Sequence, residues 1–306
     1  MKTRARGCRA IVLAAIACAP HGAHADSSTP RLAAYYERQL AICDGDAYAW
    51  TGRAAPALAM RGVTAVGVGR DDAYALTGDG RLLAWRDEPA AAQTALTEVA
   101  SFAAGDSGVL AIRADGSLWH VERARGAYRP ARTADRASAV SVGDGTDYYV
   151  AGDGKLFARG SGHRGQFGTG RLERSDEWIA VAAGVRNVRS HTGHALLLAE
   201  GGEVQGTGGN IYGPLGRHGL GDRATVWGRV FGGAAGIATG ASHSVALRAD
   251  GTLWIWGRYE SPDPRMVLEG AIGAAAGADV TIALTRDGGL WQWRSGSPPS
   301  KLRDCR

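Results

Sequence analysis

Apolar and polar residues alternate over a short stretch that recurs six times along the chain. Each stretch lies between a Gly or His and a Gly-containing dipeptide, usually Asp-Gly, that begins ten residues later. Alternation with a period of two predicts half-buried β-strands, and Asp-Gly is a strong hairpin signal. The alternating apolar pairs are Tyr74/Leu76, Leu110/Ile112, Tyr148/Val150, Leu196/Leu198, Val245/Leu247 and Ile282/Leu284. The pattern therefore predicts an array of β-hairpins.

A second strand follows each dipeptide and often ends in aromatic residues, as at Trp254 and Trp256. A seventh copy runs from Asp44 to Trp50 but lacks the preceding Gly. Successive dipeptides lie 35 to 49 residues apart, which leaves room for four short strands per unit. A four-stranded unit cannot bury both its faces alone, so the units must stack around a ring. We therefore predict an all-β fold, a β-propeller with four-stranded antiparallel blades, seven if the first copy is counted and six otherwise.

Residues 238–257 read Ala-Thr-Gly-Ala-Ser-His-Ser-Val-Ala-Leu-Arg-Ala-Asp-Gly-Thr-Leu-Trp-Ile-Trp-Gly. This segment resembles the repeat of the regulator of chromosome condensation propeller family, and the resemblance recurs in register over about residues 40 to 296. It implies the propeller fold. Only two of the six copies keep the family histidine, His194 and His243, and the family's Gly-Gln-Leu-Gly extension survives at residues 165–168 and, loosely, at 213–216.

The first 25 residues resemble a signal peptide, because four basic residues precede an apolar run and Ala23-His-Ala25 offers small residues for cleavage. A run this short does not span a bilayer, so we expect no stable membrane anchor. The whole chain has a formal net charge of +5, and removing residues 1–25 lowers it to +1. The remaining charges form no runs of like sign. Both observations disfavour nucleic-acid binding. We expect a bacterial periplasmic or secreted protein that begins near Asp26 and is a monomer.

Residues 26–39 form a lead-in to a single propeller domain at 40–306. Thr29-Pro30 followed by amphipathic residues predicts a short helix, and the same stretch is alternatively the missing inner strand of the first blade. After cleavage the chain keeps two cysteines, Cys43 in the first copy and Cys305 near the end. Because a ring brings its ends together, an oxidising compartment favours a disulfide between them, and two free thiols are the alternative.

Candidate catalytic groups are better explained by structural roles. The repeated aspartates at 44, 79, 115, 153, 250 and 287 occupy hairpin turns. Residues 160–165 match a dinucleotide-binding fingerprint, but no helix begins after them, so no cofactor is predicted. His191, His194 and His243 could hold a zinc or copper ion if they converged. The favoured interpretation is that His194 and His243 bond the loops, and no metal is expected.

In a propeller the loops between first and second strands and those between third and fourth strands lie on one face. The non-repeated residues collect there, which is typical of a recognition surface, although solvated acidic loops are an equal alternative. Six aspartates near the axis are expected to attract a cationic group, with Arg164, Phe167 and Tyr212 as large contacts. The candidate residues are Asp71, Asp72, Asp106, Asp144, Asp147, His163, Arg164, Phe167, His194, Asn210, Tyr212, His218, His243 and Asp279.

These patterns favour an exported, non-catalytic module that binds a partner, most simply a protein, through this face. A hydrolase or lyase with its site at the mouth of the axial channel is an alternative, which convergent inward carboxylates would favour. A structural component of an envelope assembly is another.

Overall fold

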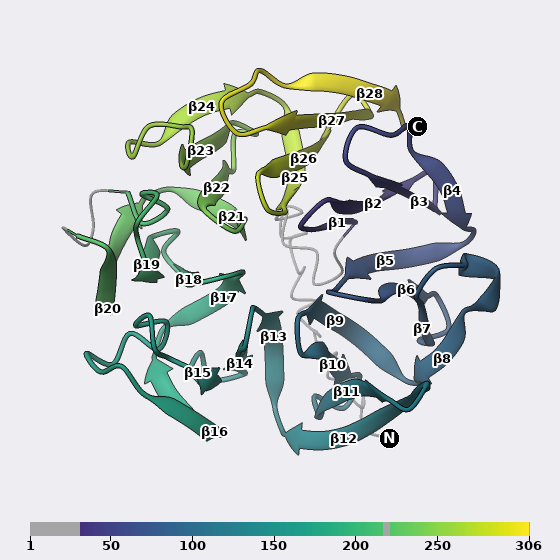
Figure 1. Cartoon of the computed structure of the whole chain (residues 1–306), viewed down its shortest axis with the longest axis horizontal. Helices are drawn as coiled ribbons and strands as arrows, with labels where there is room; N and C mark the ends of the chain where they lie inside the picture. The colour runs from purple at the N-terminus through teal and green to yellow at the C-terminus, as the bar shows by residue number, and fades with distance from the viewer. Residues whose placement is uncertain (1–30, 217–220, 306) are drawn as a thin grey trace, which may run out of the picture.

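The fold of the protein is given by a computed structural model that describes residues 31–216 and 221–305. In these ranges the chain forms seven four-stranded antiparallel sheets arranged as blades around a central axis (Figure 1). The predicted all-β propeller is confirmed, with seven blades rather than six. The predicted signal peptide (residues 1–25) and His218 lie outside the described residues.

The four strands of each blade follow one another in the sequence and lie in order from the axis to the rim. Blades 1 and 2 contain β1 (Leu32–Tyr35), β2 (Arg38–Cys43), β3 (Asp46–Thr51), β4 (Ala57–Met60), β5 (Val63–Val68), β6 (Ala73–Thr77), β7 (Leu82–Trp85) and β8 (Gln93–Leu96), with the 3₁₀ turn η1 (Pro89–Ala91) before β8. Blades 3 and 4 contain β9 (Val99–Gly105), β10 (Gly108–Arg113), β11 (Leu118–Ala124), β12 (Ala127–Ala134), β13 (Ala137–Val142), β14 (Thr146–Ala151), β15 (Leu156–Ser161) and β16 (Arg174–Ala182). Blades 5 to 7 contain β17 (Val185–Ser190), β18 (His194–Ala199), β19 (Val204–Gly209), β20 (Arg223–Phe231), β21 (Ala234–Thr239), β22 (His243–Arg248), β23 (Leu253–Gly257), β24 (Arg265–Leu268), β25 (Ala271–Ala276), β26 (Val280–Thr285), β27 (Gly289–Arg294) and β28 (Ser300–Asp304).

The repeated Asp-Gly dipeptides form the turns between second and third strands, as predicted. The carboxylate of Asp115 accepts a hydrogen bond of 2.8 Å from the amide of Ser117, and Asp250 accepts one of 2.8 Å from Thr252. Gly116, the second residue of its turn, has a positive φ of 79°, a conformation that glycine adopts without strain. The turn aspartates therefore have a structural role.

Residues 32–35 form a strand rather than the predicted helix. β1 pairs with β2 along its whole length, and Leu32 and Tyr35 are buried against the neighbouring blades. Pairing and burial in the first blade outweigh the local helix signal. The described part of the propeller therefore begins at the first strand of blade 1, not at residue 40, and the alternative interpretation was the right one. No helix in the described part of the chain has the length and apolar character needed to cross a membrane.

Apolar residues from adjacent blades form the core between them. One such cluster contains Tyr74 and Leu82 of blade 2 with Phe102 and Val109 of blade 3. Blades 5, 6 and 7 are also linked by buried side-chain bonds. His194 Nε2 lies 3.0 Å from Ser244 Oγ, and His243 Nε2 lies 2.9 Å from Thr281 Oγ1. Both family histidines thus bond side chains of the next blade, and His243 also hydrogen-bonds the backbone of Ala278, in the loop between β25 and β26, as predicted for the loops.

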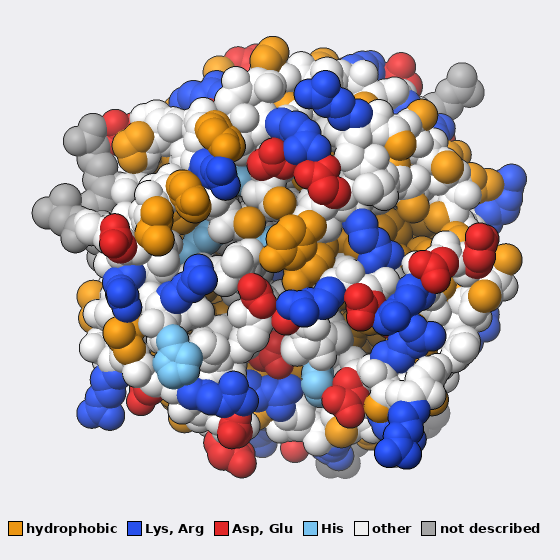
Figure 2. Space-filling view, viewed as in Figure 1, with side chains coloured by type: hydrophobic (Ala, Val, Ile, Leu, Met, Phe, Trp, Pro, Cys, Tyr) orange, Lys and Arg blue, Asp and Glu red, His pale blue; other side chains and the backbone are white. Residues whose placement is uncertain are grey.

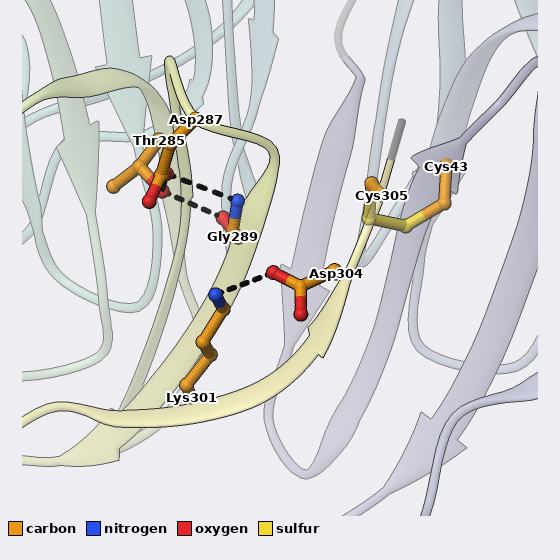
Figure 3. Close-up of a disulfide and its surroundings, with 7 residues drawn as sticks. All are labelled: Cys43, Thr285, Asp287, Gly289, Lys301, Asp304 and Cys305. Carbon is orange, nitrogen blue, oxygen red and sulfur yellow. Dashed lines mark hydrogen bonds and ion pairs between the residues drawn. A yellow bond between two sulfur atoms is a disulfide. The ribbon is translucent and has the colours of Figure 1, made fainter.

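Blades 7 and 1 close the ring without sharing a strand, because each blade is a complete sheet. Val280 begins the second strand of blade 7, where blades 5 and 6 have histidine, so this seam lacks the buried histidine bond. A disulfide instead joins Cys43, at the end of β2, to Cys305, just after β28, with Cα atoms 4.7 Å apart and a sequence separation of 262 (Figure 3). The predicted disulfide is therefore present in the structure and lies at the seam.

Candidate functional site

We call the face that carries the loops between first and second strands the loop face, and these loops the inner loops. The inner loops are residues 36–37, 69–72, 106–107, 143–145, 191–193, 240–242 and 277–279. Each passes close to the next blade. Ala241 N donates to Gly277 O at 2.8 Å, and Ala278 N donates to Tyr36 O at 3.3 Å across the seam. A Cβ on Gly277 would lie 2.4 Å from Tyr36 O, so this position requires glycine.

All six aspartates predicted near the axis pair with arginines. Arg70 bonds Asp106 and lies 3.8 Å from Asp144. Burial and the adjacent carboxylate of Asp106 raise the pKa of Asp144 above its ordinary value. In Figure 2 acidic and basic side chains alternate around the middle of the face shown. The prediction that these aspartates together attract a cationic ligand is therefore wrong. Arginines from the neighbouring loops and strands already neutralise them.

The other pairs follow the same principle. Arg86 lies 3.0 Å from Asp71 and 3.2 Å from Asp72, which is buried and also accepts a 3.2 Å hydrogen bond from Tyr128. Buried Asp147 lies 3.2 Å from Arg159 and accepts a 2.9 Å bond from Ser107. Such networks fix the inner loops of blades 2 to 4, and they leave these aspartates little capacity for a cationic ligand.

Phe167 is fully buried and is not a contact on the surface. We call the loops between third and fourth strands the outer loops. The outer loop of blade 4 turns inward because Tyr148 donates to Gln166 O at 2.8 Å and Thr207 donates to Gly165 O at 2.8 Å. The ring of Phe167 consequently packs in the core between blades 4 and 5. Leu215 is buried in the corresponding loop of blade 5. An apolar residue flanked by glycines at equivalent loop positions is the sequence signal that indicates this burial.

The histidines do not form a metal site. His191 stacks on Tyr35 with ring centres 5.1 Å apart, whereas His194 and His243 bond the next blades as described. Burial lowers the pKa values of His191 and His194 to about 3 and that of His243 to about 4. Among residues 31–216 and 221–305, no three His, Cys, Asp or Glu side chains are arranged to hold a metal ion.

The first strands of all seven blades line a cavity of about 340 Å³ along the axis. Arg31, Arg186 and Arg189 are among its lining residues. No Asp or Glu of the described chain lines it. The inward carboxylates that would favour a hydrolase or lyase are therefore not found in this cavity.

A groove of about 450 Å³ lies on the loop face over the inner loops of blades 5, 6, 7 and 1. Its floor contains the small residues Gly193, Ala241 and Ala278. Ala241 and Ala278 occupy the loop position at which blades 2 to 4 carry a charged residue, namely Arg70, Asp106 and Asp144. The outer loops of blades 5 and 6 contribute Tyr212 and Tyr259. Ion pairs thus fill the loop face over blades 2 to 4, whereas a groove lies over the inner loops of blades 5, 6, 7 and 1.

Four of the predicted residues line this groove, and the other lining residues were missed, four of them large side chains of the groove wall. The predicted ones are Arg164, His194, Tyr212 and Asp279. The missed ones are Tyr36, Ile211, Arg258 and Tyr259. Among the other candidates, His163 is exposed outside the groove lining, and Asn210 accepts a 3.0 Å hydrogen bond from the amide of Leu215, which shapes the outer loop of blade 5. The missed residues fall in or beside loops that depart from the repeat, which is a signal available in the sequence.

Two groove tyrosines have a left-handed backbone, with φ of 49° at Tyr36 and 61° at Tyr259. An aromatic residue is costly there, whereas glycine or asparagine is not. Both side chains are also well exposed, so burial offsets little of this cost. Strain of this kind at an exposed site points to a functional requirement for the side chain.

Comparisons with known proteins agree with the fold. Residues 235–258 match the regulator of chromosome condensation (RCC1) repeat. The X-linked retinitis pigmentosa GTPase regulator of Homo sapiens is 32% identical over 126 residues, and that of Mus musculus is 33% identical over 132 residues; each match covers 39% of this chain. The chain spans only 12 to 13% of the length of these relatives.

Solved structures resemble the whole ring. Yeast RCC1 (Prp20), solved with Kap60 bound, is 16% identical with a TM-score of 0.75, and the alignment covers 97% of this chain and 91% of that one. Human WBSCR16 is 15% identical with a TM-score of 0.69, and the alignment covers 83% and 86% of the two chains. The protein is thus a seven-bladed β-propeller. Its loop face carries ion pairs over blades 2 to 4 and a groove over blades 5, 6, 7 and 1. The chain is, more specifically, an RCC1-like β-propeller.

Proposed function

We propose that this protein is an exported, monomeric binding module without catalytic activity, and that it recognises a protein partner through the groove. One observation carries the proposal. Nine large hydrophobic side chains are exposed in the described residues, and four of them line this groove. They are Tyr36, Ile211, Tyr212 and Tyr259, with exposed fractions of 42, 69, 51 and 63%, respectively. Clustered exposed aromatic residues are typical of binding surfaces.

The relatives support a binding role by analogy of fold. Prp20p from Saccharomyces cerevisiae is described by its binding to Gsp1p and histones, and yeast RCC1 was solved bound to Kap60. Those partners belong to those proteins, and low identity transfers only the fold. The disulfide supports export, because disulfides persist in oxidising compartments. We expect a periplasmic or secreted protein that starts near Asp26, which N-terminal sequencing of the purified native protein checks, and no retention on DNA.

Affinity capture from the exported fraction of the producing cells tests the groove. The double variant Ile211→Ala/Tyr212→Ala should lose the captured partner because it removes two exposed contacts. The matched control Leu58→Ala/Met266→Ala removes two exposed apolar residues that do not line the groove, and it should retain the partner. A partner retained by the groove variant and lost by the control would place the binding surface elsewhere.

A further inference from the structure

Two arginines, Arg164 and Arg258, line the groove together with two carboxylates, Glu37 and Asp279. The carboxylates of Glu37 and Asp279 are both bonded by Arg294, which lies 2.7 Å from both oxygens of Asp279. In the part of the chain that the structure describes, no carboxylate lies within ion-pair distance of Arg164 or Arg258. Arg294 does not line the groove, so its pairing with the two lining carboxylates leaves the two lining arginines without ion-pair partners among the described residues.

Arg258 is held in position by two groove tyrosines. Its guanidinium carbon lies 4.6 Å from the ring centre of Tyr212 and 4.6 Å from that of Tyr259. A guanidinium nitrogen also donates a 2.7 Å hydrogen bond to the hydroxyl of Tyr259. Arginine stacked on aromatic rings loses little further freedom on binding, and its planar fork matches a carboxylate. The left-handed backbone at Tyr259 places one ring of this arrangement.

The side chain of Arg164 lies close to two glycines of the groove lining, Gly193 and Gly209. A Cβ on Gly193 would lie 2.9 Å from a guanidinium nitrogen of Arg164, and one on Gly209 would lie 3.8 Å from its Cδ. The side chain of Arg164 therefore lies over these glycines, where any larger residue at 193 would displace it. The groove thus combines two positioned guanidinium groups with an apolar wall and a floor of small residues.

We propose that the groove binds an acidic segment of the partner protein. A carboxylate of this segment bonds Arg258, Arg164 adds attraction, and a neighbouring apolar side chain packs over the small floor beside Tyr36. Charge complementarity selects this occupant, because a basic segment would meet unpaired arginines without free carboxylates. This inference rests on the proposed function, since it assumes that the groove is the binding site.

Selection from a random peptide library displayed on phage tests this inference with defined probes. The immobilised mature protein selects peptides without prior depletion on any variant, so that peptides which bind independently of Arg164 and Arg258 are also recovered. Synthetic copies of the enriched peptides are then titrated against the wild type and variants. We expect Asp or Glu next to an apolar residue in these peptides. Replacing the acidic residue of the peptide by Asn or Gln should weaken binding about ten- to a hundredfold. The substitution Arg258→Lys in the protein should have an effect of the same size.

Arg129→Gln is the matched control, because Arg129 is an exposed arginine on β12 outside the groove. It should leave the affinity unchanged. Peptides that need Tyr212 but contain no acidic residue would overturn the acidic partner and leave the proposed function standing. Peptides that are indifferent to both Tyr212→Ala and Arg258→Gln would overturn both proposals. Circular dichroism and melting curves of each variant distinguish lost contacts from unfolding.

Discussion

The indole nitrogen of Trp50 donates a 2.6 Å hydrogen bond to Oε1 of Gln292, which is 242 residues further along the chain. The amide nitrogen of Gln292 in turn donates to Gly52 O at 2.8 Å. One side chain of blade 7 therefore satisfies two polar groups of blade 1. Because the ring closes without a shared strand, the seam is held by these bonds, the disulfide and the apolar cluster around them, together with the Ala278–Tyr36 backbone bond and the Arg294–Glu37 pair.

Gln292→Leu should lower the free energy of unfolding by about 1 to 3 kcal/mol, because it leaves the buried indole N–H of Trp50 without an acceptor. Denaturant unfolding followed by fluorescence measures the change. Gln93→Leu, at an exposed position on β8, is the control and should differ from the wild type by less than about 0.5 kcal/mol. Equal stability of the two variants would show that the seam does not depend on this bond.

Cys43→Ser/Cys305→Ser should destabilise the ring most of all, because the disulfide closes almost the whole chain into one loop. Chain entropy alone gives an upper value of about 5 kcal/mol. The melting temperature of the variant should fall while its strand content by circular dichroism is kept. Thiol labelling of the unreduced, denatured mature protein checks the bond directly, and two reactive thiols would contradict it.

The repeated hairpins and their turns could be predicted because each depends on residues close in sequence. Alternation and Asp-Gly are local signals, and their recurrence in register identifies blades. The helix expected at residues 32–35 failed for the opposite reason, since the burial of Leu32 and Tyr35 against the neighbouring blades is a tertiary effect. The prediction that Phe167 is a surface contact failed for the same reason, because its burial depends on hydrogen bonds from Tyr148 and Thr207 of two different blades.

The site was predicted in part. The loop face and some groove residues, such as Arg164 and Tyr212, follow from the position of non-repeated residues over a repeated scaffold. The pairing of Asp106 with Arg70 joins neighbouring blades and cannot be read from either loop alone. The groove itself arises because small residues such as Ala241 occupy loop positions at which blades 2 to 4 carry charged residues. Equivalent loop positions can be compared in this way only once the blades are superposed in space.

Acid should destabilise the fold through its buried histidines. The folded-state pKa values of His191 and His194 are lowered to about 3 and that of His243 to about 4, so the unfolded chain binds more protons below its ordinary histidine pKa of about 6.5. Their contribution is complete above that value and is lost as the pH falls toward the folded values. Between about pH 7.5 and 5.5 each should remove about 1.4 kcal/mol of stability.

Urea unfolding across this range measures the slope. His194→Gln/His243→Gln should flatten it, because two of the three groups no longer take up protons on unfolding. His163→Gln is the control, since its ring is exposed in the folded protein, and it should keep the wild-type slope. A double variant as acid-sensitive as the wild type would assign acid unfolding to other groups.

Tyr259 should lower the stability of the fold and strengthen the binding of the partner. Tyr259→Gly relieves a left-handed backbone that costs an aromatic residue about 1 to 2 kcal/mol, and this gain roughly offsets the greater freedom of glycine in the unfolded chain. The variant should therefore be as stable as the wild type, or more so, in thermal unfolding. Tyr212→Gly is the matched control, because Tyr212 lines the same groove without a positive φ and should lose about 1 kcal/mol. Both variants should lose the partner captured by the wild type, so a Tyr259→Gly protein that binds normally would show that the strained tyrosine is not kept for recognition.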